Sequence, residues 1–215
     1  MITRVRWKEA QARESLAWRR IPAAPRGYLE RRGDFLAAWL RFHGAARRRV
    51  LEIGGAGLPA PLEGIFGVDP LVRQHAPGGR AVTARAEELP YPDASFDAAL
   101  ALNVVDHVED PGRCLAEAAR VLRPRGVLIL SCNVYARAWL LLRAARVRLL
   151  GRRNNDVLHP HHFTARSLLA LARRRFDVLE ASLRLVDPLA GERPFEPSRS
   201  RLKGEARLYL CLRPC

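Results

Sequence analysis

The stretch that decides the fold reads Val50-Leu51-Glu52-Ile53-Gly54-Gly55-Ala56-Gly57. Four residues with the character of a buried strand lead directly into a turn that contains three glycines. Because glycine has no Cβ, the backbone amides of such a turn can approach a bound nucleotide closely. The spacing Gly55-x-Gly57-x-x-Ala60 also occurs in dinucleotide sites, so the turn alone does not identify the ligand.

Two carboxylates beside the turn narrow the choice of ligand. Glu52 lies at the strand end, where it would face a cation rather than a pyrophosphate. Asp69 ends the next apolar run and is placed to accept two hydrogen bonds from ribose hydroxyls. It lies only 12 residues beyond Gly57, where a nicotinamide site would have about 20, which disfavours an oxidoreductase. A nucleoside with an ammonium group and no phosphate fits best, and S-adenosylmethionine is such a nucleoside.

Beyond residue 49, short apolar runs alternate with helical segments. The runs predict strands at 50–53, 64–68, 81–84, 96–102, 127–131, 176–183 and 207–212. Asp110 before Pro111 predicts a helix start, Pro124 with Gly126 its end, and Thr164 the cap of a later helix. This alternation is typical of a parallel sheet covered on both faces, and 215 residues with 48% apolar content suffice for one such domain.

Six motifs, in order between residues 49 and 183, resemble those of class I S-adenosylmethionine-dependent methyltransferases, especially the small-molecule (type 11-like) group. The most specific match is the loop and strand at 87–97; the others are at 52–57, 67–69, 103–108, 121–126 and 162–164. The resemblance implies an α/β fold: a Rossmann-like seven-stranded mixed sheet, order 3-2-1-4-5-7-6, with an N-terminal helical lid. The implied reaction transfers the sulfonium methyl by in-line displacement and leaves S-adenosylhomocysteine.

The resemblance also assigns site residues, at the ends of the predicted strands. Those expected to bind the cofactor are Glu52, Gly54, Gly55, Gly57, Asp69, Ala86, Glu87 and Asn103. The family usually has an Asp for the adenine amine where this chain has Arg85, so the Ala86 backbone and Glu87 are expected to substitute. Arg125 stands where glycine is usual, and only nine residues separate Gly57 from Gly67, so the first crossover is expected to be short.

His107 is the only histidine near that edge of the predicted sheet, and it is a candidate general base because an unperturbed imidazole has a pKa of about 6.5. A structural role for it is equally open, and Asn103 either touches the methionine portion or caps a helix. His159, His161 and His162 have no evident carboxylate or thiolate partners, so no metal site is expected.

Residues 1–45 are expected to form the helical lid, with Trp7, Gln11, Glu14 and Trp18 on one helix face. Residues 46–215 are expected to form the methyltransferase domain, with a helical insertion at about 134–163. Aromatic side chains of the lid and the insertion are expected to line an acceptor pocket: Trp7, Trp18, Tyr28, Tyr135, Trp139 and Phe163.

Charge and cysteine content bound the remaining choices. The net charge of +15 comes from arginine-rich segments at 19–49 and 137–153, which leaves a nucleic-acid methyltransferase as an alternative. A non-catalytic cofactor-binding or partner protein is the other alternative, since Arg85 and the short crossover are also features of a decayed site. No membrane-spanning segment or secretory signal is recognised in the sequence, so a cytoplasmic location is expected. A small-molecule substrate is expected from the resemblance, and the scattered cysteines are expected to be buried free thiols. The oligomeric state is left open.

Overall fold

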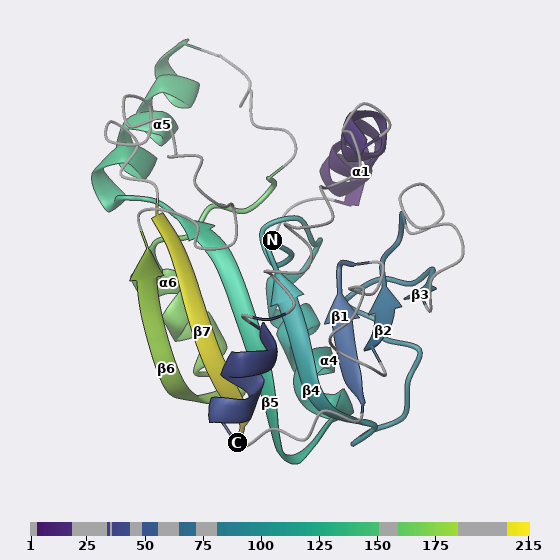
Figure 1. Ribbon diagram of the computed structural model, residues 1–215. Coiled ribbons are helices and arrows are strands. Elements are labelled where there is room, and N and C mark those ends of the chain that lie inside the picture. The colour runs from purple at the N-terminus through teal and green to yellow at the C-terminus, as the bar shows by residue number, and fades with distance from the viewer. Residues whose placement is uncertain are drawn as a thin grey trace.

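The computed structural model describes residues 4–18, 34, 36–43, 49–55, 65–71, 81–150, 159–184 and 206–215. Seven strands form one mixed sheet in the order β3-β2-β1-β4-β5-β7-β6 (Figure 1). This confirms the predicted fold class and strand order. The strands are β1 (Val50–Ile53), β2 (Ile65–Val68), β3 (Ala81–Val82), β4 (Phe96–Leu102), β5 (Leu122–Val134), β6 (Phe176–Arg184) and β7 (Ala206–Pro214).

The first five strands in the chain pair in parallel, and β7 runs antiparallel to both β5 and β6. All four residues of β1 are buried, as expected for a central strand with both faces covered. Strand β5 begins earlier than predicted because Leu122 already pairs with Phe96 ahead of a register shift. Arg125, in the position that is usually glycine, has a φ of +70°, so the bend keeps the left-handed conformation without the residue that favours it.

Two capped helices cover one face of the sheet. In α4 (Pro111–Val121) the Asp110 carboxylate accepts hydrogen bonds from the amides of Gly112 and Arg113. In α6 (Ala165–Ala172) Thr164 and Ser167 form a capping box. Both predicted helix starts are confirmed, although α4 ends at Val121 because the chain enters β5 at the next residue. The buried sides of both helices join the larger hydrophobic core.

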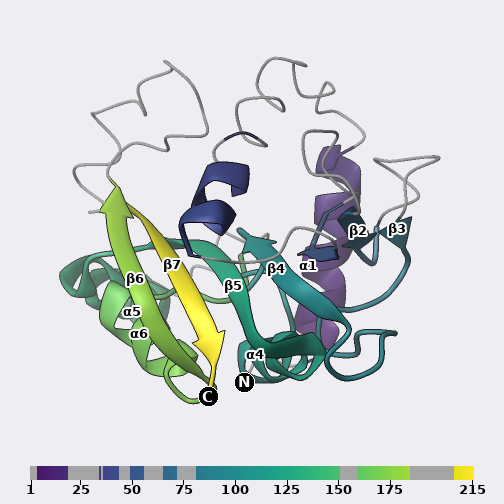
Figure 2. The same cartoon turned by 60° about the horizontal axis from the view of Figure 1, so that its bottom comes forward.

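The opposite face is covered by a helix at residues 36–42, which Figure 2 shows against β4, β5 and β7. Leu36 and Leu40 are fully buried there among Val50, Ala98 and Ile129. We expected residues 1–45 to form one lid, and the structure differs for this part. Burial of these two leucine side chains against the sheet stabilises the fold, so this segment belongs to the core.

Two further helices lie beyond the carboxyl ends of the parallel strands: α1 (Arg4–Trp18), and α5 (Arg137–Leu150) within the predicted insertion (Figure 1). In the part of the chain that the structure describes, no helix has the length and apolar character needed to span a bilayer. Cys114, Cys132 and Cys211 are buried free thiols, as expected, and Cys215 is exposed. Burial raises the pKa of the Cys211 thiol to about 12.

Candidate cofactor and acceptor site

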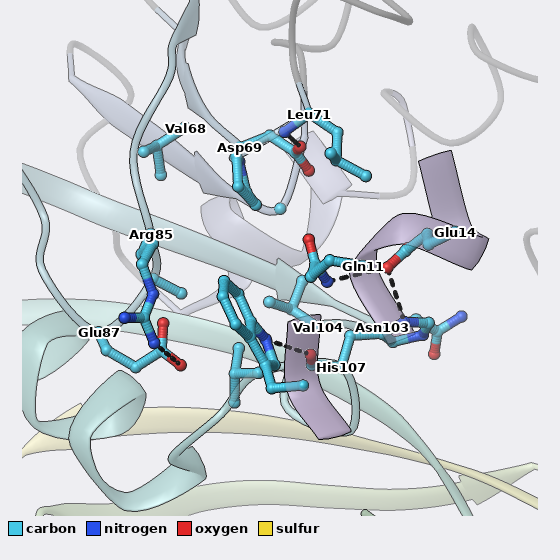
Figure 3. Close-up of a pocket in the computed structure, with 15 residues that line it drawn as sticks. Gln11, Glu14, Val68, Asp69, Leu71, Arg85, Glu87, Asn103, Val104 and His107 are labelled. Atoms are coloured by element: carbon cyan, nitrogen blue, oxygen red, sulfur yellow. Dashed lines mark hydrogen bonds and ion pairs between the residues drawn. The ribbon is translucent and has the colours of Figure 1, made fainter. Parts of the chain in front are cut away.

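A cavity lies where the parallel strands end, and α1 forms its other side (Figure 3). This position is typical of ligand sites in open α/β sheets. Six predicted site residues line it: Gly54, Asp69, Ala86, Glu87, Asn103 and His107. The other residues that line it are Trp7, Gln11, Glu14, Val68, Pro70, Leu71, Arg85, Val104 and Val108.

Backbone hydrogen bonds fix the strand-end side of the cavity. The amide of Gly54 donates to Val68 O at 2.7 Å, and the amide of Asp69 donates to Val82 O at 3.2 Å. The amide of Asn103 donates to Ser131 O at 2.8 Å. Each bond continues the sheet ladder one step past the end of its strand. The positions of these residues are therefore set by the sheet itself.

The glycine turn is tightly packed. Gly54 has a φ of +73°, and a Cβ there would overlap Val104 Cγ2. A Cβ on Gly55 would come within 2.6 Å of Glu52 Cγ. Glu52 is thus buried against the turn, and neither it nor Gly55 is among the described residues that line the cavity. Gly57 and most of the first crossover lie outside the described residues.

Three oxygen acceptors border the cavity. Asp69 accepts a hydrogen bond from the Leu71 amide at 2.5 Å, which holds its carboxylate at the end of β2. The side-chain amide oxygens of Asn103 and Gln11 are buried and have no hydrogen-bond partner in the described part of the chain. Such oxygens cost free energy unless a ligand or water donates to them. These three groups can accept hydrogen bonds, and ribose hydroxyls and an ammonium group are suitable donors.

Arg85 places a positive charge at the side of the cavity where the family usually has an acidic residue. Its guanidinium lies 4.4 Å from the ring centre of Trp7 and donates to Glu109 at 2.7 Å. Glu87 Oε1 is 3.3 Å from Arg85 and also accepts the backbone amides of Glu109 and Asp110. Glu87 therefore lines the cavity and at the same time anchors the loop that carries His107.

Helix α1 closes the cavity through one face. Trp7 Nε1 donates to the backbone oxygen of His107 at 3.1 Å, and Gln11 donates to Glu14 at 3.2 Å. The Glu14 carboxylate lies 3.3 Å from His107 Nδ1, an ion pair when the imidazole is protonated (Figure 3). The helical spacing of these residues had indicated a shared face, and all three line the cavity.

The other aromatic side chains expected in the pocket have different positions. Tyr135 stacks on Trp139 with ring centres 4.9 Å apart, and both pack near His162. Neither they nor Phe163 are among the described residues that line the cavity. The side chain of Trp18 and all of Tyr28 lie outside what the structure describes. The insertion therefore packs on itself in this region.

A cluster of possible metal ligands lies beside His107, which the sequence analysis missed. Donor atoms of Asp106, His107 and His159 all lie within 4.8 Å of one another. His161 and His162, which lie close to His159 in the sequence, have other contacts. His161 Nε2 lies 3.0 Å from Val108 O, and burial lowers the pKa of its imidazole, while His162 contacts Arg143. The adjacency of Asp106 and His107 was the available signal.

Comparisons with known proteins agree with this geometry. A methyltransferase-domain family model matches residues 65–130. An uncharacterised methyltransferase of Mycobacterium sp. strain JLS is 39% identical over 102 residues, covering 41% of this chain and 40% of that protein. The 27-O-demethylrifamycin SV methyltransferase of Amycolatopsis mediterranei is 48% identical over 71 residues, covering 32% of this chain and 26% of that protein. The matches thus span well under half the length of these relatives.

The fold comparison extends further than the sequence matches. A protein assigned as a methyltransferase from Bacillus halodurans C-125 superposes with a TM-score of 0.59 at 16% identity, over 85% of this chain and all of that one. The domain match and the relatives support a class I S-adenosylmethionine-dependent methyltransferase domain, and the solved structure shares its fold. This confirms the resemblance found in the sequence.

Proposed function

We propose that the protein transfers a methyl group from S-adenosylmethionine to a small-molecule acceptor by in-line displacement. One observation carries the proposal: a single cavity joins the Asp69 carboxylate and the buried Asn103 amide oxygen on its strand-end side to His107 on its helix side. This arrangement provides one place for a nucleoside with an ammonium group and an adjacent place for a nucleophile.

The strand-end residues fit the cofactor. Asp69 would accept the ribose hydroxyls, and Asn103 with Gln11 would accept ammonium hydrogens that their orphaned oxygens lack. Gly54 and Ala86 both border the cavity, and the Ala86 region would take the adenine edge. The bound cofactor supplies a methyl group activated by its positively charged sulfur.

The helix side receives the acceptor. An oxygen or nitrogen lone pair on the acceptor forms the new bond to the methyl carbon, while the electrons of the breaking carbon–sulfur bond stay on sulfur. Any proton that the acceptor nucleophile carries must leave. We assign His107, which lines this end of the cavity, as the general base that accepts it. Holding both reactants in line and excluding water supplies about 7–11 kcal/mol of the catalysis.

A small acceptor is favoured over a nucleic acid. Helix α1 is fixed across the cavity by Trp7 and Glu14, so the acceptor must fit between this helix and the strand ends. A nucleotide base in a polymer would have to displace this helix. A salt-sensitive, tight complex with a defined RNA or DNA would favour the nucleic-acid alternative instead.

Calorimetry with S-adenosylhomocysteine tests the cofactor assignment. We expect binding by the full chain, and we expect Asp69→Ala to weaken it by about 1–3 kcal/mol, the usual cost of leaving buried polar partners unpaired. Glu88→Gln is the matched control, because Glu88 pairs with Arg113 at the exposed surface away from the cavity. Tighter binding of NADH than of either adenosyl compound would contradict the proposal.

A cofactor-binding protein without turnover is the second candidate, favoured by Arg85 in place of the usual acidic residue. Transfer of a labelled methyl group to any member of a panel of phenols, alcohols and amines separates the two functions. Cofactor binding without transfer to any acceptor in that panel would favour the second candidate.

A further inference from the structure

We propose that Asp106, His107 and His159 bind a divalent transition-metal ion, with Zn²⁺ the best match, beside the acceptor end of the cavity, which His107 lines. The chemical basis is a two-imidazole, one-carboxylate donor set, which suits zinc and leaves coordination positions open. The role of the ion in catalysis rests on the proposed methyltransferase function, whereas its binding does not.

The donor atoms are gathered and partly dehydrated. They lie within 4.8 Å of one another, and the His107 and His159 rings meet edge to face with centres 4.6 Å apart. Asp106 is only 3% exposed. Its carboxylate interacts with the Cys132 thiol, but its Oδ1 has no hydrogen-bond partner in the described part of the chain. A buried carboxylate oxygen without a donor is costly unless a cation compensates it. This oxygen is the independent observation that points to a positively charged ligand.

The backbone around the three residues is well anchored. The His161 amide donates to Asp106 O at 3.2 Å, and its ring nitrogen contacts Val108 O, so the two loops that carry the donors are joined. The Tyr135 amide donates to Phe163 O at 2.8 Å and ties the second loop to the end of β5. Ligands on a fixed backbone bind metal with less loss of conformational entropy.

Glu14 completes the site from the lid helix. Its carboxylate lies 3.3 Å from His107 Nδ1, and carboxylates commonly orient metal-bound imidazoles in this way. Neighbouring ligand atoms on a tetrahedral zinc lie about 3.3 Å apart, as bond lengths of about 2.0–2.1 Å require. The side chains must therefore close in by small χ rotations when the ion binds, and Glu14 would hold His107 during this adjustment.

The bound ion specifies the class of acceptor. An ion held by these residues would lower the pKa of an acceptor hydroxyl that ligates it, so the hydroxyl could lose its proton to water. The acceptor oxygen would then form the bond to the methyl carbon while the electrons of the breaking carbon–sulfur bond stay on sulfur. We therefore infer an oxygen acceptor, best with a second neighbouring oxygen to chelate the ion. In this assignment His107 holds the metal instead of acting as the general base.

Equilibrium dialysis of the chelator-treated full chain against Zn²⁺, and the visible spectrum with Co²⁺, test the site without any methyl donor. We expect one ion per chain, with Asp106→Asn and His159→Ala each lowering affinity at least tenfold and Glu14→Gln lowering it about tenfold. His162→Ala is the matched control, because His162 lies in the same segment but contacts Arg143. Its affinity should equal that of the unaltered chain.

Two outcomes would overturn the metal site: no stoichiometric binding, or binding that Asp106→Asn and His159→Ala leave unchanged. S-adenosylhomocysteine affinity is measured on the same variants and should stay unchanged, which shows that they fold. Failure of the metal site with intact cofactor binding and methyl transfer would leave the proposed function standing. Metal binding by a chain that binds no adenosyl ligand would support the metal site and contradict the proposed methyltransferase function.

Discussion

The two sides of the cavity are built in different ways. The strand-end side consists of residues whose amides extend the sheet ladder, such as Gly54, Asp69 and Asn103. The helix side is held by a few side-chain contacts of α1. Trp7 contacts both His107 and Arg85, and Glu14 contacts His107. A change on the first side disturbs the sheet, whereas a change on the second disturbs only a helix. The structure thus separates a fixed cofactor side from a replaceable acceptor side.

Removal of residues 1–20 should break this comparison most sharply. The deletion takes away Trp7, Gln11 and Glu14. We expect methyl transfer to be abolished, while S-adenosylhomocysteine affinity falls only a few-fold because the cofactor loses one hydrogen bond, that to the Gln11 oxygen. Calorimetry and a labelled-methyl assay on the same preparation give both quantities. Loss of cofactor binding together with transfer would show that the two sides are one unit.

Gly54→Ala should damage the fixed side. The new Cβ would overlap Val104, and a φ of +73° strains any residue other than glycine by about 1–2 kcal/mol. We expect weaker cofactor binding and a lower Tm. Combining it with Val104→Ala removes the overlap but leaves the backbone strain, so recovery should be partial; complete recovery would show that φ matters little here.

Trp7→Phe should have a smaller effect, confined to the helix side. The phenyl ring keeps an aromatic face over Arg85 but loses the indole hydrogen bond to His107 O, worth about 0.5–1.5 kcal/mol. We expect the acceptor KM to rise several-fold at unchanged S-adenosylhomocysteine affinity. An equal change in both would place Trp7 on the cofactor side.

Glu117→Gln should have the smallest effect. Hydrogen bonding from Arg120 holds the pKa of the Glu117 carboxyl below its usual 4.5, and this carboxylate also accepts the Leu89 amide that supports the strand-end side. Because the folded pKa is depressed, the stabilisation is present above pH 4.5 and is lost as the pH falls through the folded value. The Tm difference from the unaltered chain should therefore be modest at pH 7 and should shrink as the pH falls below 4.5 through the depressed folded pKa. A difference that persists in acid would mean that packing, not charge, is responsible.

The sequence predicted most of the sheet and much of the strand-end side, because local patterns carry that information. Continuous apolar runs mark buried parallel strands, and residues such as Asp69 must follow them at the same sheet edge. The helical stripe of Trp7, Gln11 and Glu14 likewise revealed a common face. These features depend on residues that lie close together in the chain.

The sequence did not reveal the contacts between distant segments. Asp106 and His159 lie far apart in the chain and meet only because the loops after β4 and α5 converge, a position that periodicity does not encode. The same limit explains why Leu36 and Leu40 were assigned to a lid, since an apolar stripe shows that a helix is buried but not against what. For the same reason, the sequence does not reveal that Glu87 accepts hydrogen bonds from the backbone amides of Glu109 and Asp110.

The Trp7 indole touches both halves of the site: its ring lies over Arg85 on the cofactor side, and its Nε1 holds the backbone of His107 on the acceptor side. A ligand that shifts Arg85 must therefore change how firmly the acceptor end is closed. By thermodynamic linkage, the factor by which the cofactor alters acceptor affinity equals the factor by which the acceptor alters cofactor affinity. Because the factor is the same in both directions, coupling through Trp7 would set how strongly one ligand favours the other, and not the order in which the two bind.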